Sequence, residues 1–255
     1  MEQSLYNKLK TDLGLSDAVN EYIEVLVRKL ESESLSEEEF QEIATKYDIK
    51  VNDVSVNDAT SKIRGYYIVS TYQILEAYFT EFNDYLNKFS STFRKKDNGE
   101  SMLKYIYCRL LDMQRVNDEA YLYYLICDYY RLTRNYIAHV DNKRKIENMY
   151  ISVNERRNDI AEKFPKLAAP NSMGRIGFDD FVLYSRSAKK LAKILFESVQ
   201  YDLDKVANSI DLKKYAKYIN SPDRYRNAIK YELQIRFPLK NEDVEFVVEK
   251  LTQKV

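Results

Sequence analysis

The sequence has few of the residues that break helices and few of those that build metal sites. Its 255 residues include 5 glycines, 4 prolines, 2 cysteines, 1 histidine and no tryptophan. Because glycine and proline interrupt helices, a chain this long with so few of them is expected to be mostly helical. One histidine and two separate cysteines, Cys108 and Cys127, cannot complete the usual zinc sites. We therefore predict no metal and no cofactor, and we expect both cysteines to be buried thiols.

Excess charge and long apolar runs are also missing. The 40 Lys and Arg residues balance 40 Asp and Glu residues, so the formal net charge is zero. No global field then attracts nucleic acid or acidic lipid, and any site for a polyanion must be a local patch. No stretch approaches the roughly 18 consecutive apolar residues of a membrane-spanning helix. The first residues, MEQSLYNKLKTDLG, are too polar for a signal peptide. We expect a cytoplasmic protein that makes no contact with a membrane.

What the chain does have is apolar periodicity at helical spacing. Ser16 is the expected cap of the first strong segment, and Ser36 with Glu39 forms a capping-box pattern. Pro222 is expected at the first position of a helix near the C-terminus. Segment 165–177 holds two prolines and two glycines and is expected to be a loop. The predicted helices are 16–32, 34–49, 58–89, 102–114, 120–139, 142–164 and 178–203.

These helices predict an all-α fold with an up-and-down helical bundle as its core. The bundle is expected to span residues 58–203, because the long helices of that region are joined by short turns except at the 165–177 loop. Residues 1–57 are expected to form an N-terminal helical segment, and residues 204–255 a C-terminal one. No strand alternation and no internal repeat is present.

The only histidine, His139, stands near the end of the helix predicted over 120–139. On a helical wheel, Asp128, Arg131, Asn135 and His139 project together as a polar strip. The strip is expected to lie opposite the core face, so that His139 points away from the core. The predicted core face consists of Leu122, Leu125, Ile126, Tyr129, Leu132, Thr133, Tyr136, Ile137 and Val140.

This combination of side chains suits the cleavage of a phosphodiester. A histidine can take the proton of a ribose 2′-OH, or in its protonated form give one to the leaving 5′-oxygen. An arginine can hold the phosphate and stabilise the charge that develops on it. Because the 2′-OH of RNA is itself the nucleophile, this chemistry needs no metal. One histidine supplies only one of the two proton-transfer groups, so we infer a symmetric dimer whose facing strips supply two copies of Arg134 and His139.

The segment RNYIAH, Arg134 to His139, resembles the R-x4-H motif of the HEPN superfamily, the helical ribonuclease domains of toxin–antitoxin, abortive-infection and CRISPR-linked systems. Asn135 and Ala138 fit the polar and small residues that members often have there. The resemblance covers about residues 58–203. It implies a metal-independent endoribonuclease of bacterial defence, working as a homodimer on RNA. Arg134 and His139 would be the catalytic pair and Asn135 their support. A partner protein such as an antitoxin is part of that setting.

The sequence departs from the HEPN pattern at two points. Members paired with a nucleotidyltransferase antitoxin tend to have a tyrosine two residues after the histidine, where this chain has Asp141. Regulation through such a tyrosine is therefore not expected. An ideal helix also places Arg134 about 140° away from His139. The helix must loosen at its end, the arginine must wrap round it, or the two residues must meet through a partner chain.

Further cations near the motif are candidates for binding the RNA backbone. Arg131 lies closer to the polar strip than Arg134, and Lys143, Arg144 and Lys145 follow the histidine directly. We predict that these four residues bind substrate phosphates. The alternative is that the basic run is a solvated surface, that His139 only caps a helix end favourably, and that Arg134 pairs with a nearby acid. Under that alternative the protein is a non-catalytic helical adaptor or regulatory binding module.

The acidic pair in the FDDF segment (178–181) has two readings as well. Paired carboxylates can bind a metal ion, but the first turn of a helix favours aspartate without one. We predict the second, because the segment begins the helix expected over 178–203.

Overall fold

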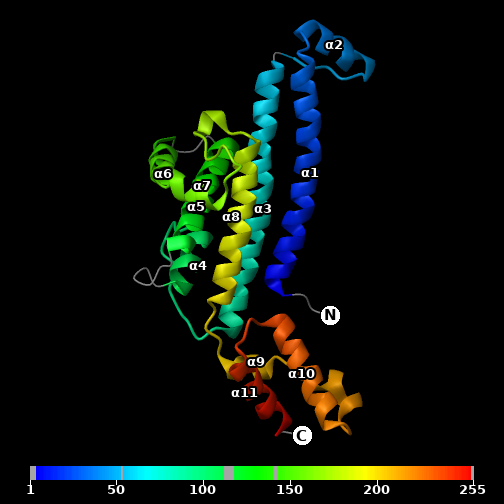
Figure 1. Ribbon diagram of the computed structural model, residues 1–255, viewed down its shortest axis with the longest axis vertical. Coiled ribbons are helices and arrows are strands. Elements are labelled where there is room, and N and C mark those ends of the chain that lie inside the picture. The colour runs from blue at the N-terminus through cyan, green and yellow to red at the C-terminus, as the bar shows by residue number, and fades with distance from the viewer. Residues whose placement is uncertain (1–3, 53, 112–117, 140–142, 254–255) are drawn as a thin grey trace. The chain divides into compact units, whose positions relative to one another are not determined.

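The protein is described by a computed structural model that covers residues 4–52, 54–111, 118–139 and 143–253. The all-α prediction is confirmed: these residues form helices packed in a bundle, with no strand among them (Figure 1). A single isolated antiparallel bridge joins Ser90 and Tyr201. None of the helices described is both long and apolar enough to cross a bilayer.

The α-helices are α1 (Leu5–Glu33), α2 (Glu37–Lys46), α3 (Val56–Phe89), α4 (Met102–Leu110), α5 (Asp118–His139), α6 (Lys143–Glu155), α7 (Arg157–Lys163), α8 (Phe178–Glu197), α9 (Leu203–Asn208), α10 (Pro222–Arg236) and α11 (Asn241–Thr252). Two short 3-10 helices, η1 (Met173–Arg175) and η2 (Leu212–Tyr218), lie between them.

Several predicted boundaries are confirmed. The Ser36 hydroxyl accepts a hydrogen bond from the Glu39 amide at 3.2 Å, and the Ser36 amide donates to the Glu39 carboxylate at 2.8 Å, which completes the capping box. α10 begins at Pro222. Segment 165–177 connects α7 to α8 as a loop that contains only η1.

Other boundaries were predicted wrongly. α1 begins at Leu5, and Ser16 lies inside it, because a serine inside a helix carries no signal that distinguishes it from a cap. The helix predicted over 142–164 is two helices, and the backbone leaves helical geometry at Arg156 (φ −96°, ψ 17°). α8 ends at Glu197, and the Asp202 carboxylate caps a separate helix, α9, by accepting from the amides of Asp204 and Lys205.

Packing divides the chain into two compact units. The terminal unit contains Met1–Lys10, Glu76–Asn117 and Leu191–Val255, and the central unit contains Thr11–Leu75 and Asp118–Lys190. Helices α1, α3 and α8 each contribute residues to both. The division into segments 1–57, 58–203 and 204–255 stays a prediction.

In the terminal unit, the C-terminal helices α9, α10 and α11 enclose an apolar cluster with the end of α3. The Tyr85 hydroxyl on α3 lies 2.9 Å from the Tyr201 hydroxyl, just before α9. The buried members of the cluster are Phe89, Val206, Ala207, Ile210, Tyr225, Ile229, Leu233, Phe237, Val244, Val247, Val248 and Leu251.

In the central unit, α3 and α8 run between α1 on one side and α5 on the other (Figure 1). Arg64 of α3 binds the carboxylates of Glu24 and Glu31 on α1, with nearest distances of 2.9 and 2.8 Å. On α8, Ser185 donates a hydrogen bond to Asp17 of α1 at 2.8 Å. These contacts make α1 part of the central bundle.

The acidic pair at the start of α8 holds the preceding loop. Asp179 and Asp180 occupy the first turn of α8, as predicted. Asp180 is fully buried. Its carboxylate accepts hydrogen bonds, each of 2.8 Å, from the Tyr130 hydroxyl, the Asn171 amide and side chain, and the Gly177 amide. These donors satisfy the hydrogen-bonding capacity of the buried carboxyl group.

The two cysteines are free thiols in different surroundings. Cys127 is buried, as predicted, and burial raises the pKa of its thiol strongly. Cys108 is only half-buried, so the prediction that both are buried was wrong for this residue.

Candidate active site

The predicted polar strip of α5 is buried at its first residue, Asp128, and exposed at its last, His139. Asp128 is buried, and the Arg131 Nε donates to its carboxylate at 2.6 Å. Burial alone would lower the pKa of Arg131, but the hydrogen bond and charge of Asp128 raise it above the ordinary value. The expectation that the whole strip faces away from the core was therefore wrong for its first half. α5 is covered on several sides: Tyr129 packs on Tyr150 of α6, and Tyr130 packs on Tyr184 of α8.

The catalytic candidate Arg134 is held on α3. Its guanidinium carbon lies 4.6 Å from the ring centroid of Tyr72, a cation–π distance. Its Nη1 donates to the Asn135 side-chain oxygen at 3.1 Å, so the first two predicted site residues are in contact. Its Nε is buried and has no hydrogen-bond partner. No carboxylate in the described part of the chain forms an ion pair with Arg134, unlike Arg131 one turn earlier.

The imidazole of His139 is exposed at the last residue of α5, and Ala138 beside it is exposed too. α5 is helical as far as His139, so the helix does not loosen between the two motif residues. The separation of about 140° around the helix axis therefore holds. Arg134 lies over Tyr72 on α3, so it does not wrap round α5 towards His139. Contact between the motif residues through a second chain stays a prediction.

Three of the four predicted phosphate-binding residues lie together. Lys143, Arg144 and Lys145 form the first turn of α6 and are all exposed. That turn contains no acidic residue, although the helix dipole favours one there. α6 packs on α5, and the cluster follows His139 closely in sequence. Arg131, the fourth residue, is half-buried in its pair with Asp128. Val140 and Asp141 lie outside the described residues.

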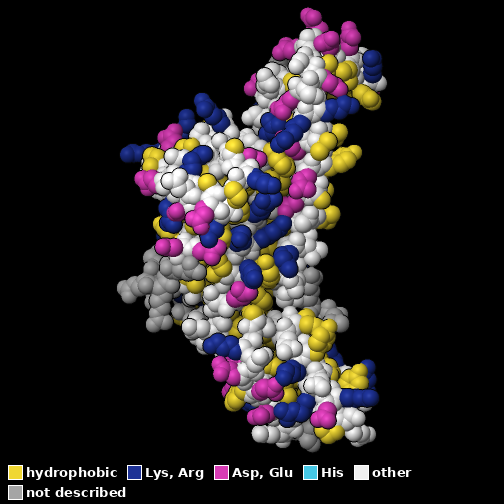
Figure 2. All heavy atoms as spheres, in the orientation of Figure 1, with side chains coloured by type: hydrophobic (Ala, Val, Ile, Leu, Met, Phe, Trp, Pro, Cys, Tyr) yellow, Lys and Arg dark blue, Asp and Glu magenta, His cyan; other side chains and the backbone are white. Residues whose placement is uncertain are grey.

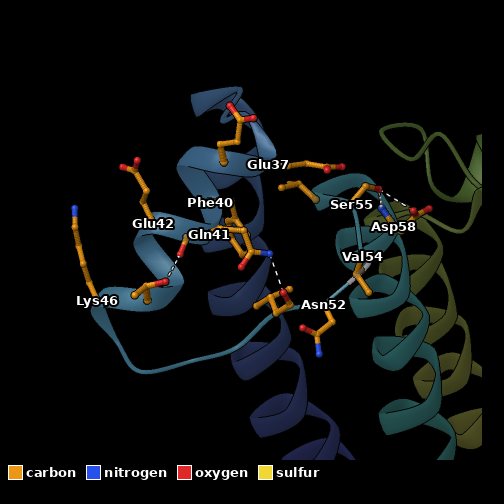
Figure 3. A pocket seen from close by; sticks show the side chains of 13 residues that line it. Glu37, Phe40, Gln41, Glu42, Lys46, Asn52, Val54, Ser55 and Asp58 are labelled. Atoms are coloured by element: carbon orange, nitrogen blue, oxygen red, sulfur yellow. Dashed lines mark hydrogen bonds between the residues drawn. The ribbon is translucent and has the colours of Figure 1, made fainter.

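A hollow of the described surface lies away from these residues. It has a volume of about 1110 Å³ and is formed by α2 and the segment that leads into α3. Figure 3 shows Gln41 reaching across it, where its amide donates to the Val51 carbonyl at 2.8 Å. Glu37, Glu38 and Asp58 also line it, and none of the predicted site residues does. A hollow with this acidic lining does not suit a polyanion.

Sequence reasoning missed Asp128 as the partner of Arg131, and Tyr72 as the surface on which Arg134 rests. Asp128 was placed on the polar strip, and its spacing of three from Arg131 is a usable signal for an ion pair within one helix. Tyr72 carries no such signal, because the contact joins α3 to α5. In the described part of the chain, no group of three His, Cys, Asp or Glu side chains is arranged to hold a metal ion.

No protein-family model, curated protein or solved structure matches this chain.

Proposed function

We propose that the protein is a metal-independent endoribonuclease whose active site combines Arg134, Asn135 and His139. The main support is a contrast within one helix: Arg131 is neutralised by Asp128, whereas Arg134 forms no ion pair with a described residue. An arginine with spare donors, near an exposed histidine and an exposed basic cluster, can bind and activate a phosphodiester.

The site is completed by a second copy of the chain. Because Arg134 and His139 point to different sides of α5, one phosphate cannot contact both residues of the same helix. A two-fold axis at the exposed end of α5 would bring His139 of one protomer close to Arg134 of its partner. It would also supply the second proton-transfer group.

In the proposed reaction, the 2′-oxygen attacks the adjacent phosphorus and its proton passes to neutral His139. The bond from phosphorus to the 5′-oxygen breaks, and the partner's His139, in its protonated form, gives a proton to that oxygen. Arg134 stabilises the additional negative charge on the phosphoryl oxygens, while Asn135 holds the guanidinium in place. The products are a 2′,3′-cyclic phosphate and a 5′-hydroxyl, so atoms and charge balance.

The surroundings of the site fit a substrate with a charged backbone. Lys143, Arg144 and Lys145 would bind phosphates on either side of the cleaved bond. By its resemblance to HEPN proteins, we place the enzyme in the cytoplasm, in bacterial defence, and under the control of an antitoxin or another defence protein.

The direct test is cleavage of a mixed RNA pool in excess EDTA. We expect products with 2′,3′-cyclic phosphate ends, and we expect His139→Ala to reduce the rate by at least about 100-fold. Arg134→Ala should reduce it by a similar factor, and Arg134→Lys by less. The exposed Arg175 serves as a matched control, and Arg175→Ala should cleave at the full rate. Equal cleavage by the wild-type protein and His139→Ala would rule the proposal out.

A non-catalytic interaction module is the second candidate. It is favoured by the contacts that tie Arg131 to Asp128 and Arg134 to Tyr72, which give both arginines a structural role. This candidate predicts that RNA stays intact at high protein concentration. It also predicts that Arg134→Ala lowers the thermal midpoint of unfolding while His139→Ala leaves it unchanged.

A further inference from the structure

The outer face of α1 carries large apolar side chains that nothing in the described structure covers. Five of them, Leu15, Val19, Tyr22, Val25 and Leu26, are 71%, 52%, 70%, 67% and 52% exposed. The opposite face of the same helix holds buried Leu13, Asn20, Glu24 and Val27, which pack towards α3 and α8. Figure 2 shows hydrophobic side chains protruding along α1 at the edge of the molecule. A contiguous apolar strip of this kind is typical of an interaction surface.

The strip has the spacing of a coiled-coil seam. Leu15, Val19, Tyr22 and Leu26 are separated by four, three and four residues, which is the alternation of heptad positions a and d. Asp12 and Lys29 continue the alternation at the two ends, and both are exposed. The seam from Asp12 to Lys29 is about 26 Å long at 1.5 Å per residue. A second helix can therefore pack along it over nearly five turns.

When the order of residues along the seam is reversed, apolar residues match apolar residues, and the two charged residues match residues of opposite charge. In an antiparallel pair, each a position faces a d position of the other helix. Leu15 then faces Leu26, Val19 faces Tyr22, and Asp12 faces Lys29. Each charged contact occurs twice, once at each end of the seam. A parallel pair would instead place Asp12 against Asp12 and Lys29 against Lys29, and like charges at those positions oppose pairing.

We propose that this face, which we call the α1 seam, binds the same face of a second copy of the chain in antiparallel orientation. A lipid surface fits less well, because helices that lie on membranes have a polar face rich in Lys and Arg, whereas this strip is bordered by charges of both signs, Asp12 and Glu21 as well as Arg28 and Lys29. Binding of an unrelated protein would not explain why the apolar and charged residues of the seam match their own order in reverse.

The contact is distinct from the one that completes the proposed ribonuclease site. In the central unit, α3 and α8 lie between α1 and α5, so the α1 seam is on a different side of that unit from α5, the helix that ends at His139 (Figure 1). The proposal therefore does not rest on the proposed function. A chain that used both surfaces would assemble beyond a dimer, and His139→Ala would leave the α1 seam intact.

Charge exchange at the ends of the seam tests the proposal on the full chain. We expect Asp12→Lys to place lysine against Lys29 twice, and Lys29→Asp to place aspartate against Asp12 twice. Each variant should raise the dissociation constant of the pair by about tenfold or more in sedimentation equilibrium at low salt. An equimolar mixture of the two variants should recover association, because the mixed dimer has opposite charges at both ends. The double variant Asp12→Lys, Lys29→Asp should also recover it.

Three outcomes would overturn the proposal: no association of the wild-type chain at about 100 µM, single variants that associate as the wild type does, or a mixture that fails to recover. A parallel pair would give the second outcome, in which single variants associate as the wild type does. In that pair, Asp12→Lys would only replace a contact between two aspartates with a contact between two lysines. Tyr22→Glu is a further variant, at an apolar position of the seam that faces no charged residue of the second helix. Its exposed position leaves the fold unaffected, as circular dichroism would verify, and it should remove association altogether.

Discussion

The surroundings of two buried aspartates, Asp128 and Asp180, determine which side chains near α5 are available to a ligand. Asp128 is buried and holds Arg131 at 2.6 Å, which removes that arginine from the exposed surface. Asp180 is also buried but forms no ion pair with a described residue, and its carboxylate accepts hydrogen bonds from neutral donors. Arg134 forms no ion pair with a described residue and donates instead to the neutral side chain of Asn135. At the scale of single residues, this difference is why we assign Arg134, and not Arg131, to the proposed chemistry.

The positions of the motif residues on one helix could be predicted from the sequence, and the partners of their side chains could not. Spacing along a helix located Arg134, Asn135 and His139, because residues of one helix are related by a fixed rotation. The surface that receives each side chain depends on how helices pack. That is why Tyr72, on another helix, gave no signal, and why Asp128 was taken for a surface residue.

Loss of the Asp180 carboxylate should destabilise the protein strongly. Asp180→Ala leaves the Tyr130 hydroxyl and the amides of Asn171 and Gly177 without their acceptor in a buried site. We expect a decrease of about 3 kcal/mol in the free energy of unfolding, measured by urea denaturation. The neighbouring Asp179 accepts a single hydrogen bond, from the Ala168 amide at 2.7 Å, so Asp179→Ala is the control and should cost about 1 kcal/mol. Equal losses for the two variants would show that Asp180 does not organise the loop.

At the scale of helices, the existence and type of elements could be predicted, and their limits less well. The helices around 58–89 and 120–139 were predicted within two residues, because their apolar periodicity is long and they begin and end near polar segments. The break between α6 and α7 at Arg156 could not be predicted, because no proline or glycine marks it in the sequence. The role of α1 in the bundle was missed, because only contacts such as those between Arg64 and Glu24 show what a helix packs on.

The ion cluster between α1 and α3 should make stability depend on pH. The Arg64 guanidinium, by its hydrogen bond above all, lowers the pKa of Glu31 below the ordinary value of 4.5. A lowered pKa in the folded state stabilises the protein above the unfolded-state pKa, and this stabilisation is lost as the pH falls through the folded-state value. Arg64→Met should lower the free energy of unfolding by about 2 kcal/mol at pH 7, because buried Glu24 also loses a partner.

Urea denaturation at pH 7 and at pH 3.5 provides the measurement. The difference between the wild-type protein and Arg64→Met should shrink at the lower pH, because pH 3.5 lies below the ordinary pKa of Glu31 and part of the stabilisation from its lowered folded-state pKa is then lost. Arg28 is the matched control: it also binds Glu24, at 3.0 Å, but it is largely exposed, so Arg28→Ala should cost at most about 1 kcal/mol. A difference that stays constant or grows on acidification would contradict the assignment of the effect to this cluster.

For the whole molecule, a net charge of zero means that affinity for RNA must come from local clusters. Figure 2 shows Lys and Arg side chains interspersed with Asp and Glu over the face in view. Lys143, Arg144 and Lys145 are the exposed basic cluster that follows His139 in the sequence. If the proposed ribonuclease binds its substrate there, a small fraction of the 40 basic residues should account for most of the binding energy.

Replacing these three residues with glutamine should weaken RNA binding at least about tenfold. Each lost phosphate contact also removes about 0.7 from the slope of log affinity against log salt for a single strand, so the slope should fall by up to about 2. Fluorescence polarisation with labelled RNA, in a His139→Ala background that prevents cleavage, measures both quantities. Glutamine at Lys213, Lys214 and Lys217, three exposed lysines of η2, removes the same charge from another surface and should change neither. Equal weakening by both triple variants would mean that RNA responds to total charge, and the cluster beside His139 would then have no special role.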